Sequence, residues 1–131
     1  MIYLASLYKE ESRASIAQIA NAIGENEHTV GKLLQTLSKA EIINSSKGPH
    51  GGFFLSKEQF AQPLSKIVKA IDGADTFRKC GLGLSKCSEK HPCPIHHEFK
   101  EGRDLIEQLF NRKKISELYK PFEQGLTFLN D

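Results

Sequence analysis

A pair of helical patterns followed at once by a glycine-rich turn constrains the fold of this chain more than any other feature. Ser15 and Gln18 form the Ser-x-x-Gln pattern that satisfies free amide groups at a helix start, and Gly24 supplies a stop. A second helix is expected from about Glu27, after a short break. The apolar residues, which are expected to face inward, are Ile16, Ile19, Ala20 and Ile23 in the first helix and Val30, Leu33, Leu34 and Leu37 in the second. Two short helices joined by a turn that contains glycine predict a helix-turn-helix arrangement.

Two short β-prone runs follow these helices, at residues 42–43 and 53–55. The segment between them, residues 44–52, contains three glycines and a proline, which are typical of a turn. This pattern predicts a hairpin. A helix-turn-helix followed by a hairpin is the outline of a winged helix, so we expect a mainly α-helical fold with a small β-wing.

A further capping-box pattern at Ser56 and Gln59 introduces the second half of the chain. A helical face follows and ends at Gly73, and a last helix and a shorter one near residues 115–118 close the chain. The apolar residues are Leu64, Ile67, Val68 and Ile71 in the first of these helices and Phe99, Ile106, Leu109 and Phe110 in the last long one. Between them the periodicity disappears. A long stretch of this kind in a small domain is usually functional or disordered.

Length and charge exclude some classes of protein. With 131 residues, 39% of them hydrophobic, the chain can bury a core without a disulfide staple. No apolar run approaches the ~20 residues of a membrane span, and no signal-peptide pattern opens the chain, so we expect neither a membrane protein nor a secreted scaffold. The net charge of +2 does not by itself indicate a nucleic-acid partner.

The three cysteines, Cys80, Cys87 and Cys93, all lie within fourteen residues, and His96 follows the last of them. Clustered thiols in an odd number indicate a reducing compartment, here the cytoplasm, and metal ligation or redox chemistry. Three thiolates and one imidazole supply four ligands, which suits a structural zinc site as well as an iron–sulfur cluster. The wide spacing favours the cluster over zinc, and free thiols are the remaining alternative.

The surroundings of the thiols support metal ligation over catalysis. Four basic residues favour ionised thiolates and offset an anionic cluster: Arg78, Lys79, Lys86 and Lys90. His96 has a second interpretation, as a cap of the last helix, and His97 could take either role. A cysteine nucleophile paired with one of these histidines would explain one thiol rather than three. We therefore do not expect an enzyme.

Candidate DNA contacts lie at the start of the second helix and in the hairpin turn. The N-terminal part of the second helix of a helix-turn-helix meets base edges. Glycines in the turn let the backbone approach a phosphate or a groove wall. The candidates are Glu27, His28, Thr29 and Lys32 in the helix and Lys47, Gly48, His50 and Gly51 in the turn. Because residues 1–57 hold six Lys and Arg against five acidic residues, we expect modest affinity per subunit and a second half-site bound by a dimer. The alternative for the second helix is an ordinary core helix with a polar outer face.

Three motifs closely resemble one protein family: Ile-Ala-Gln-Ile at residues 16–19, Leu-Leu-Gln-Thr-Leu at 33–37, and Lys-Gly-Pro-His-Gly-Gly-Phe at 47–53. Over nearly its whole length the chain is similar to the Rrf2 family of bacterial winged-helix transcription regulators, and in particular to its cluster-binding branch. The resemblance implies promoter DNA as one partner. It also implies a homodimer in which the long C-terminal helix, about residues 94–112, packs against the other subunit.

The resemblance also implies a ligand set. Cluster-binding members carry three cysteines in the loop before the long helix, which correspond to Cys80, Cys87 and Cys93 around a 2Fe–2S or 4Fe–4S cluster. Some members add a histidine three residues after the last cysteine, which is His96 here. In others an acidic residue from a segment upstream of Met1, donated by the partner subunit, is a ligand, so here we expect His96 or an external ligand. One acidic position of the family's recognition helix is Gly31 in this chain, so the target sequence does not transfer.

Together these patterns divide the chain into a winged helix-turn-helix DNA-binding domain at 1–57, a connecting helix at 58–76, a cluster-binding cysteine loop at 77–97, and a dimerisation helix with a C-terminal tail at 98–131. The hypothesis is a DNA-binding repressor whose promoter binding is gated by an iron–sulfur cluster that senses nitric oxide, oxygen or iron–sulfur status. The alternative is a zinc-bound or metal-free thiol-switch interaction module with weak or no DNA binding.

Overall fold

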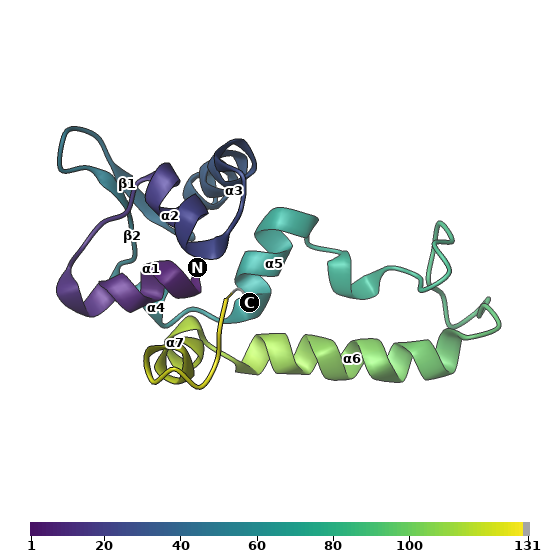
Figure 1. Ribbon diagram of the computed structural model, residues 1–131. Helices are drawn as coiled ribbons and strands as arrows, with labels where there is room; N and C mark the ends of the chain where they lie inside the picture. The colour runs from purple at the N-terminus through teal and green to yellow at the C-terminus, as the bar shows by residue number, and fades with distance from the viewer. Residues whose placement is uncertain (130–131) are drawn as a thin grey trace.

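The computed structural model describes residues 1–129 and has a winged-helix head from which one long helix extends (Figure 1). The elements in chain order are α1 (Ile2–Leu7), the 3-10 turn η1 (Tyr8–Glu10), α2 (Ile16–Ile23), α3 (Glu27–Lys39), β1 (Asn44–Ser46), β2 (Gly52–Phe54), α4 (Lys57–Phe60), α5 (Leu64–Asp72), the 3-10 turn η2 (Thr76–Arg78), α6 (His96–Arg112) and α7 (Ile115–Glu123). The expected fold class, mainly α-helical with a small antiparallel wing, is confirmed.

The helix-turn-helix begins and ends where its sequence signals predict. The Ser15 hydroxyl accepts a hydrogen bond from the Gln18 N–H, and the Gln18 side chain accepts one from the Ser15 N–H, which completes the capping box of α2. Gly24 ends the helix with a φ of +68°. The Asn26 side chain caps α3 by accepting from the N–H groups of His28 and Thr29. The two helices therefore have fixed ends around a short turn.

Leu33 differs from the expected pattern. It was expected to face the core with Val30, Leu34 and Leu37, but it is 40% exposed. The buried residues of α3 are Val30, Gly31, Leu34 and Leu37, so Gly31, which faces Ile16 of α2, takes the buried place expected for Leu33.

The wing contains a third extended segment that the sequence did not indicate. β1 and β2 pair in the register Asn44 with Phe54 and Ser46 with Gly52. Ala14, in the link between η1 and α2, exchanges two backbone hydrogen bonds with Phe53. Gly52 allows this close approach, because its φ is +142° and an added Cβ would lie 2.7 Å from the carbonyl oxygen of Ala14. The wing is thereby fixed to the helix-turn-helix.

The second half of the chain joins the head to the long helix. The segment expected as one connecting helix, residues 58–76, contains α4 and α5, which are separated at residues 61–63, where Pro63 precedes α5. The Ser56–Gln59 capping box is present at the start of α4. The Gln62 amide is buried and donates to the carbonyl of Ile42, which fixes this break to the head.

The last helix returns to the head. Ile115 and Tyr119 of α7 are almost fully buried in the same core as Leu4 and Ala5 of α1, and α1 and α7 contact each other. The N–H of Ile115 donates to the carbonyl of Gln62. The residues after α6 therefore include a structural part of the head, beyond the tail that was expected there.

The long helix α6 is fixed at its C-terminal end and extends away from the head, with the cysteine-containing loop at its far end (Figure 1). α5 contacts both α3 and α6, and η2 contacts both α5 and α6. A continuous series of packed elements therefore joins the loop to the helix expected to contact DNA.

Candidate functional site

The residues expected to contact DNA are all accessible in α3 and the wing. Glu27, His28, Thr29 and Lys32 are exposed on the first two turns of α3, while Val30 and Leu34 hold the opposite face in the core. In the wing turn, Lys47, Gly48 and His50 are exposed and Gly51 is half-buried. The helix start and the wing tip thus both present polar groups to an approaching partner.

Gly51 has an internal role in the wing turn. An added Cβ at this position would lie 2.3 Å from the carbonyl oxygen of Ser46, and the N–H of Gly51 donates to the carbonyl of Gly48. The expected reason for the paired glycines was close approach of the backbone to a phosphate. In the structure, Gly51 and Gly52 let the turn close on itself and on Ala14.

Arg13 is a wing residue that the sequence patterns did not single out. Its guanidinium carbon lies 4.4 Å from the ring centre of Phe54, and it donates a hydrogen bond to the hydroxyl of Ser46. It lines a surface cavity of about 390 Å³ together with Gln18 and His50. Arg13 lies outside every periodic pattern of the sequence. It reaches the wing because its neighbour Ala14 pairs with Phe53 of β2.

The four candidate metal ligands, three in the loop and His96 at the start of α6, stand as two pairs. The Sγ atoms of Cys80 and Cys93 are 4.0 Å apart, and Cys87 Sγ lies 3.4 Å from His96 Nδ1. All three cysteines are half-buried and unoxidised. Among residues 1–129, no three His, Cys, Asp or Glu side chains stand close enough together to hold a single metal ion.

His96 is a buried residue in the first turn of α6, and it does not cap the helix. The residue is 3% exposed, and its Nε2 atom is buried and has no hydrogen-bond partner among residues 1–129. Its ring meets that of His97 edge-on at 5.1 Å between centres, and His97 is exposed. An imidazole that is buried with one nitrogen beside a thiol and the other unpaired is a suitable soft-metal donor.

Cys80 is prepared for ligation by the backbone of its own loop. Hydrogen bonds from the N–H of Leu82 and then of Leu84 lower the pKa of the Cys80 thiol, with a smaller contribution from Cys93. Gly81 lies against Phe99 of α6, where an added Cβ would come within 2.6 Å of the ring. A surface cavity of about 490 Å³ is lined by Cys80, Cys87 and basic side chains that include Arg78, Lys79 and Lys86.

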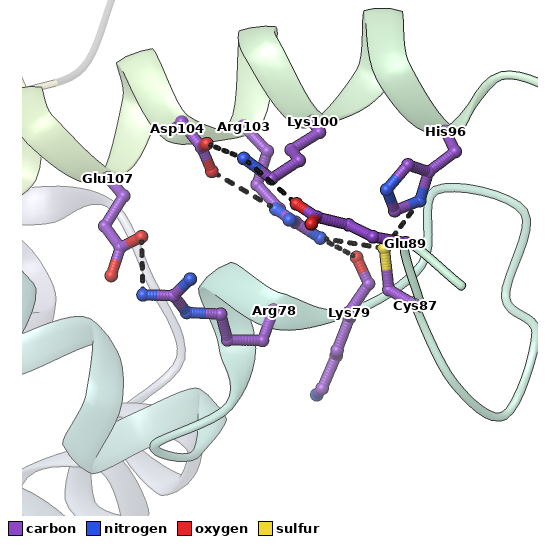
Figure 2. A network of polar contacts seen from close by, with 9 residues as sticks. All are labelled: Arg78, Lys79, Cys87, Glu89, His96, Lys100, Arg103, Asp104 and Glu107. Atoms are coloured by element: carbon purple, nitrogen blue, oxygen red, sulfur yellow. Dashed lines mark hydrogen bonds and ion pairs between the residues drawn. The ribbon is translucent and has the colours of Figure 1, made fainter. Parts of the chain in front are cut away.

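A polar face of α6 meets the loop, as Figure 2 shows. Its residues recur at helical spacing: His96, Lys100, Arg103, Asp104 and Glu107. Arg103 donates from Nη1 to the carbonyl of Lys79 (3.1 Å) and to Cys87 Sγ (3.3 Å). Lys100 pairs with Asp104 at 2.9 Å and with Glu89 at 3.8 Å, and Arg78 pairs with Glu107 at 3.6 Å. The sequence patterns did not single out Arg103. The signal that could have found it is its position two helical turns after His96, on the same face of α6.

A separate face of α6 is apolar and exposed. Its residues also recur at helical spacing: Ile95, Phe99, Gly102, Ile106 and Leu109. Ile106 is 53% exposed, and Gly102 has an open space where a side chain would stand. A mainly apolar cavity of about 430 Å³ lies at this face, between Phe77, Phe99 and Ile106. Apolar groups at this spacing on an exposed helix favour a partner surface.

The loop residues fit an iron–sulfur cluster by donor chemistry. An iron–sulfur cluster is bound by thiolates and in some proteins by imidazole. The loop offers three thiols, one of them with a lowered pKa, and the buried imidazole of His96. Arg103 and the neighbouring lysines suit the negative charge of a thiolate-bound cluster. The donors stand as two pairs, so binding needs a rearrangement of the loop.

The fold, together with the exposed first turns of α3, defines the chain as a winged helix-turn-helix protein, a class that binds double-stranded DNA. The chain belongs to the Rrf2 family, described as iron-dependent transcriptional regulators, whose sequence profile matches residues 1–121. It is therefore a transcription regulator, and its relatives are regulators rather than enzymes.

Similar proteins agree with this assignment. A protein of Aquifex aeolicus named as an HTH-type transcriptional regulator is 33% identical over 99 residues, which cover 74% of this chain and 69% of that protein. The HTH-type transcriptional regulator IscR of Vibrio cholerae is 24% identical over 86% of this chain and 65% of its own length. The chain thus spans about two thirds of the length of these relatives.

Solved structures share the fold at low sequence identity. T. potens IscR has a TM-score of 0.73 at 19% identity, with 96% of this chain and 82% of that chain covered. CymR, the global cysteine regulator of B. subtilis, has a TM-score of 0.72 at 21% identity, with 91% and 86% covered. Within the described part of the chain, no helix is both long and apolar enough to cross a membrane.

Proposed function

We propose that this regulator is a cytoplasmic repressor whose affinity for promoter DNA is set by an iron–sulfur cluster in the loop at residues 77–97. The observation that carries the proposal is the juxtaposition of Cys87 with the buried His96 at the start of α6. When bound, the cluster would supply a group that oxygen, nitric oxide or iron shortage modifies or removes. Cys80, Cys87, Cys93 and His96 would hold it.

The loop is placed to influence the DNA-reading helix through packed elements. His96 begins α6, and α6 contacts α5, which in turn contacts α3. The loop has two states, one held against the start of α6 and one released from it. These states can orient the two winged-helix heads of a dimer differently. A difference of about 1.4 kcal/mol between the states changes the affinity for DNA tenfold.

The DNA-binding half of the proposal is tested by selection from a pool of random duplexes of about 30 base pairs, long enough for two half-sites one helical turn apart. We expect one enriched sequence with two-fold symmetry, bound with an affinity that falls steeply with salt. The reconstituted and metal-free proteins should bind it with different affinities. Weak binding without enrichment or salt dependence would favour the interaction module.

We further propose that two copies associate through the apolar face of α6, the residues Ile95, Phe99, Gly102, Ile106 and Leu109. In a two-fold dimer each residue of this face is buried twice, and each buried isoleucine contributes about 1.5–3 kcal/mol. Ile106→Glu should therefore raise the dimer dissociation constant by about two orders of magnitude or more, measured by analytical ultracentrifugation.

The matched control for this substitution is Gln108→Glu, which adds the same charge to an exposed position on another side of α6. Its dimer dissociation constant should equal that of the unmodified protein. An Ile106→Glu protein that remains as strongly dimeric as the control would assign the interface to another surface.

A thiol switch is the second candidate function, and the 4.0 Å separation of the Cys80 and Cys93 sulfurs favours it. Peroxide would oxidise the two thiols, which lose two protons and two electrons as the S–S bond forms, while the peroxide is reduced to two waters. In metal-free protein we expect peptide mapping to find the Cys80–Cys93 disulfide and a free Cys87. A mixture of all three pairings would show that the thiols have no preferred partner.

A further inference from the structure

Arg103 is a basic side chain of α6 that donates a hydrogen bond to a candidate ligand, Cys87. Its side chain is only 9% exposed, although it carries a full charge. Its Nη1 donates to both the carbonyl of Lys79 and the sulfur of Cys87 (Figure 2). A buried guanidinium is unfavourable unless it is well paired, so these contacts determine where the loop lies.

The pairing of Arg103 on its own helix is weak. Asp104 approaches Arg103 Nε at 3.8 Å but is held by Lys100 at 2.9 Å, and within the described part of the chain Arg103 Nε has no hydrogen-bond partner. The hydrogen bonds of Arg103 therefore go to the loop, across 24 residues of sequence to Lys79 and 16 to Cys87. A loop that moved away from α6 would leave a buried charge without its partners.

We propose that Arg103 is the positioning residue that couples the state of the cysteine loop to α6. One nitrogen of its guanidinium group holds two points of the loop, the residue after η2 and the thiol of Cys87, against the same helix face that carries His96. A change at Cys87 then alters the pairing of a buried charge on the helix that forms the proposed dimer contact. This assignment deepens the proposed function and rests on it for the identity of the signal.

The test compares Arg103→Met and Arg103→Lys with Arg112→Met. Methionine keeps most of the length of the arginine side chain but removes its positive charge. Lysine keeps the positive charge but lacks the planar array of N–H donors of the guanidinium group. Arg112 is the matched control because it carries the same group on the same helix, but it is exposed in the last turn of α6, at the end remote from the cysteine loop.

The first readout uses reduced, metal-free protein. Backbone hydrogen exchange of the peptide at residues 79–90 should be about tenfold faster in Arg103→Met, intermediate in Arg103→Lys and unchanged in Arg112→Met. Since lysine retains the charge, Arg103→Lys also serves if Arg103→Met does not fold. If both Arg103 variants exchange at the rate of the unmodified protein, Arg103 does not hold the loop against α6. This conclusion does not depend on what the loop binds.

The second readout uses protein reconstituted with iron and sulfide. An N–H donor to a ligand sulfur raises the reduction potential of a cluster, so the potential should fall in Arg103→Met and not in Arg112→Met. The ratio of DNA affinities between reconstituted and metal-free protein should also fall toward one. Unmodified protein that takes up no iron would refute the proposed function, while the exchange experiment would still decide the role of Arg103.

Discussion

Cys87→Ala is expected to abolish cluster binding and, with it, the difference in DNA affinity between reconstituted and metal-free protein. Cys87 is the thiol that lies between His96 Nδ1 and Arg103 Nη1, so its removal takes away one ligand and the contact of the loop with α6. Visible absorbance per protein after reconstitution should fall by about tenfold or more, since a cluster that loses a thiolate is rarely retained. Absorption spectra and DNA titrations of the same samples measure both effects.

Ser85→Ala is the matched control, because Ser85 lies in the same loop and lines the same cavity as Cys87. This variant should bind the cluster and switch as the unmodified protein does. A Cys87→Ala protein that reconstitutes fully and still switches would remove Cys87 from the ligand set. If Cys87→Ala loses its visible absorbance but its DNA affinity still differs between reconstituted and metal-free protein, the cluster does not control DNA binding.

Lys32→Glu is expected to weaken DNA binding by roughly tenfold to a hundredfold, because a dimer carries the change twice. Lys32 is exposed near the start of α3, on the side away from the buried Val30 and Leu34. Loss of a phosphate contact in each subunit should also lower the slope of binding against salt by about one per contact. Fluorescence anisotropy over a series of salt concentrations measures both quantities.

Lys39→Glu makes the same charge change at the exposed last turn of α3. Because this end of the helix is remote from the turns expected to meet DNA, binding should change much less than in Lys32→Glu. Equal losses in the two variants would indicate a long-range charge effect in place of a contact. Unchanged binding in Lys32→Glu would remove α3 from the DNA interface.

The local elements of the head were predictable because their signals are local. The capping box at Ser15 and Gln18 and the stop at Gly24 fixed α2, and both are present in the structure. The hairpin was predicted, but its first strand was misplaced: β1 lies at Asn44–Ser46, in the expected turn, while the run at 42–43 is two isoleucines buried in the core. Such signals depend on hydrogen bonds within a few residues, so no knowledge of the tertiary packing is needed.

The contacts between distant segments were not predictable in this way. The pairing of Ala14 with Phe53 and the burial of Tyr119 against α1 join segments far apart in sequence. Leu33 matched the helical period, yet Gly31 is buried on α3 and Leu33 is exposed. Periodicity indicates that a helix has an apolar face, but its neighbours decide where the centre of that face lies.

The candidate site was partly predictable. The thiols and His96 follow from residue type and spacing, and the structure brings Cys87 to His96 and Cys80 to Cys93. Arg103 did not stand out because arginine on a long helix is ordinarily solvated. Its function follows only from burial and from the two groups it contacts.

The central claim, that the loop at residues 77–97 holds an iron–sulfur cluster, is tested most directly by the visible absorption spectrum of protein purified without oxygen. We expect broad sulfur-to-iron charge-transfer bands that bleach on exposure to air or nitric oxide. A colourless protein that stays colourless after incubation with iron and sulfide would contradict the claim, and zinc or free thiols would then account for the cysteines.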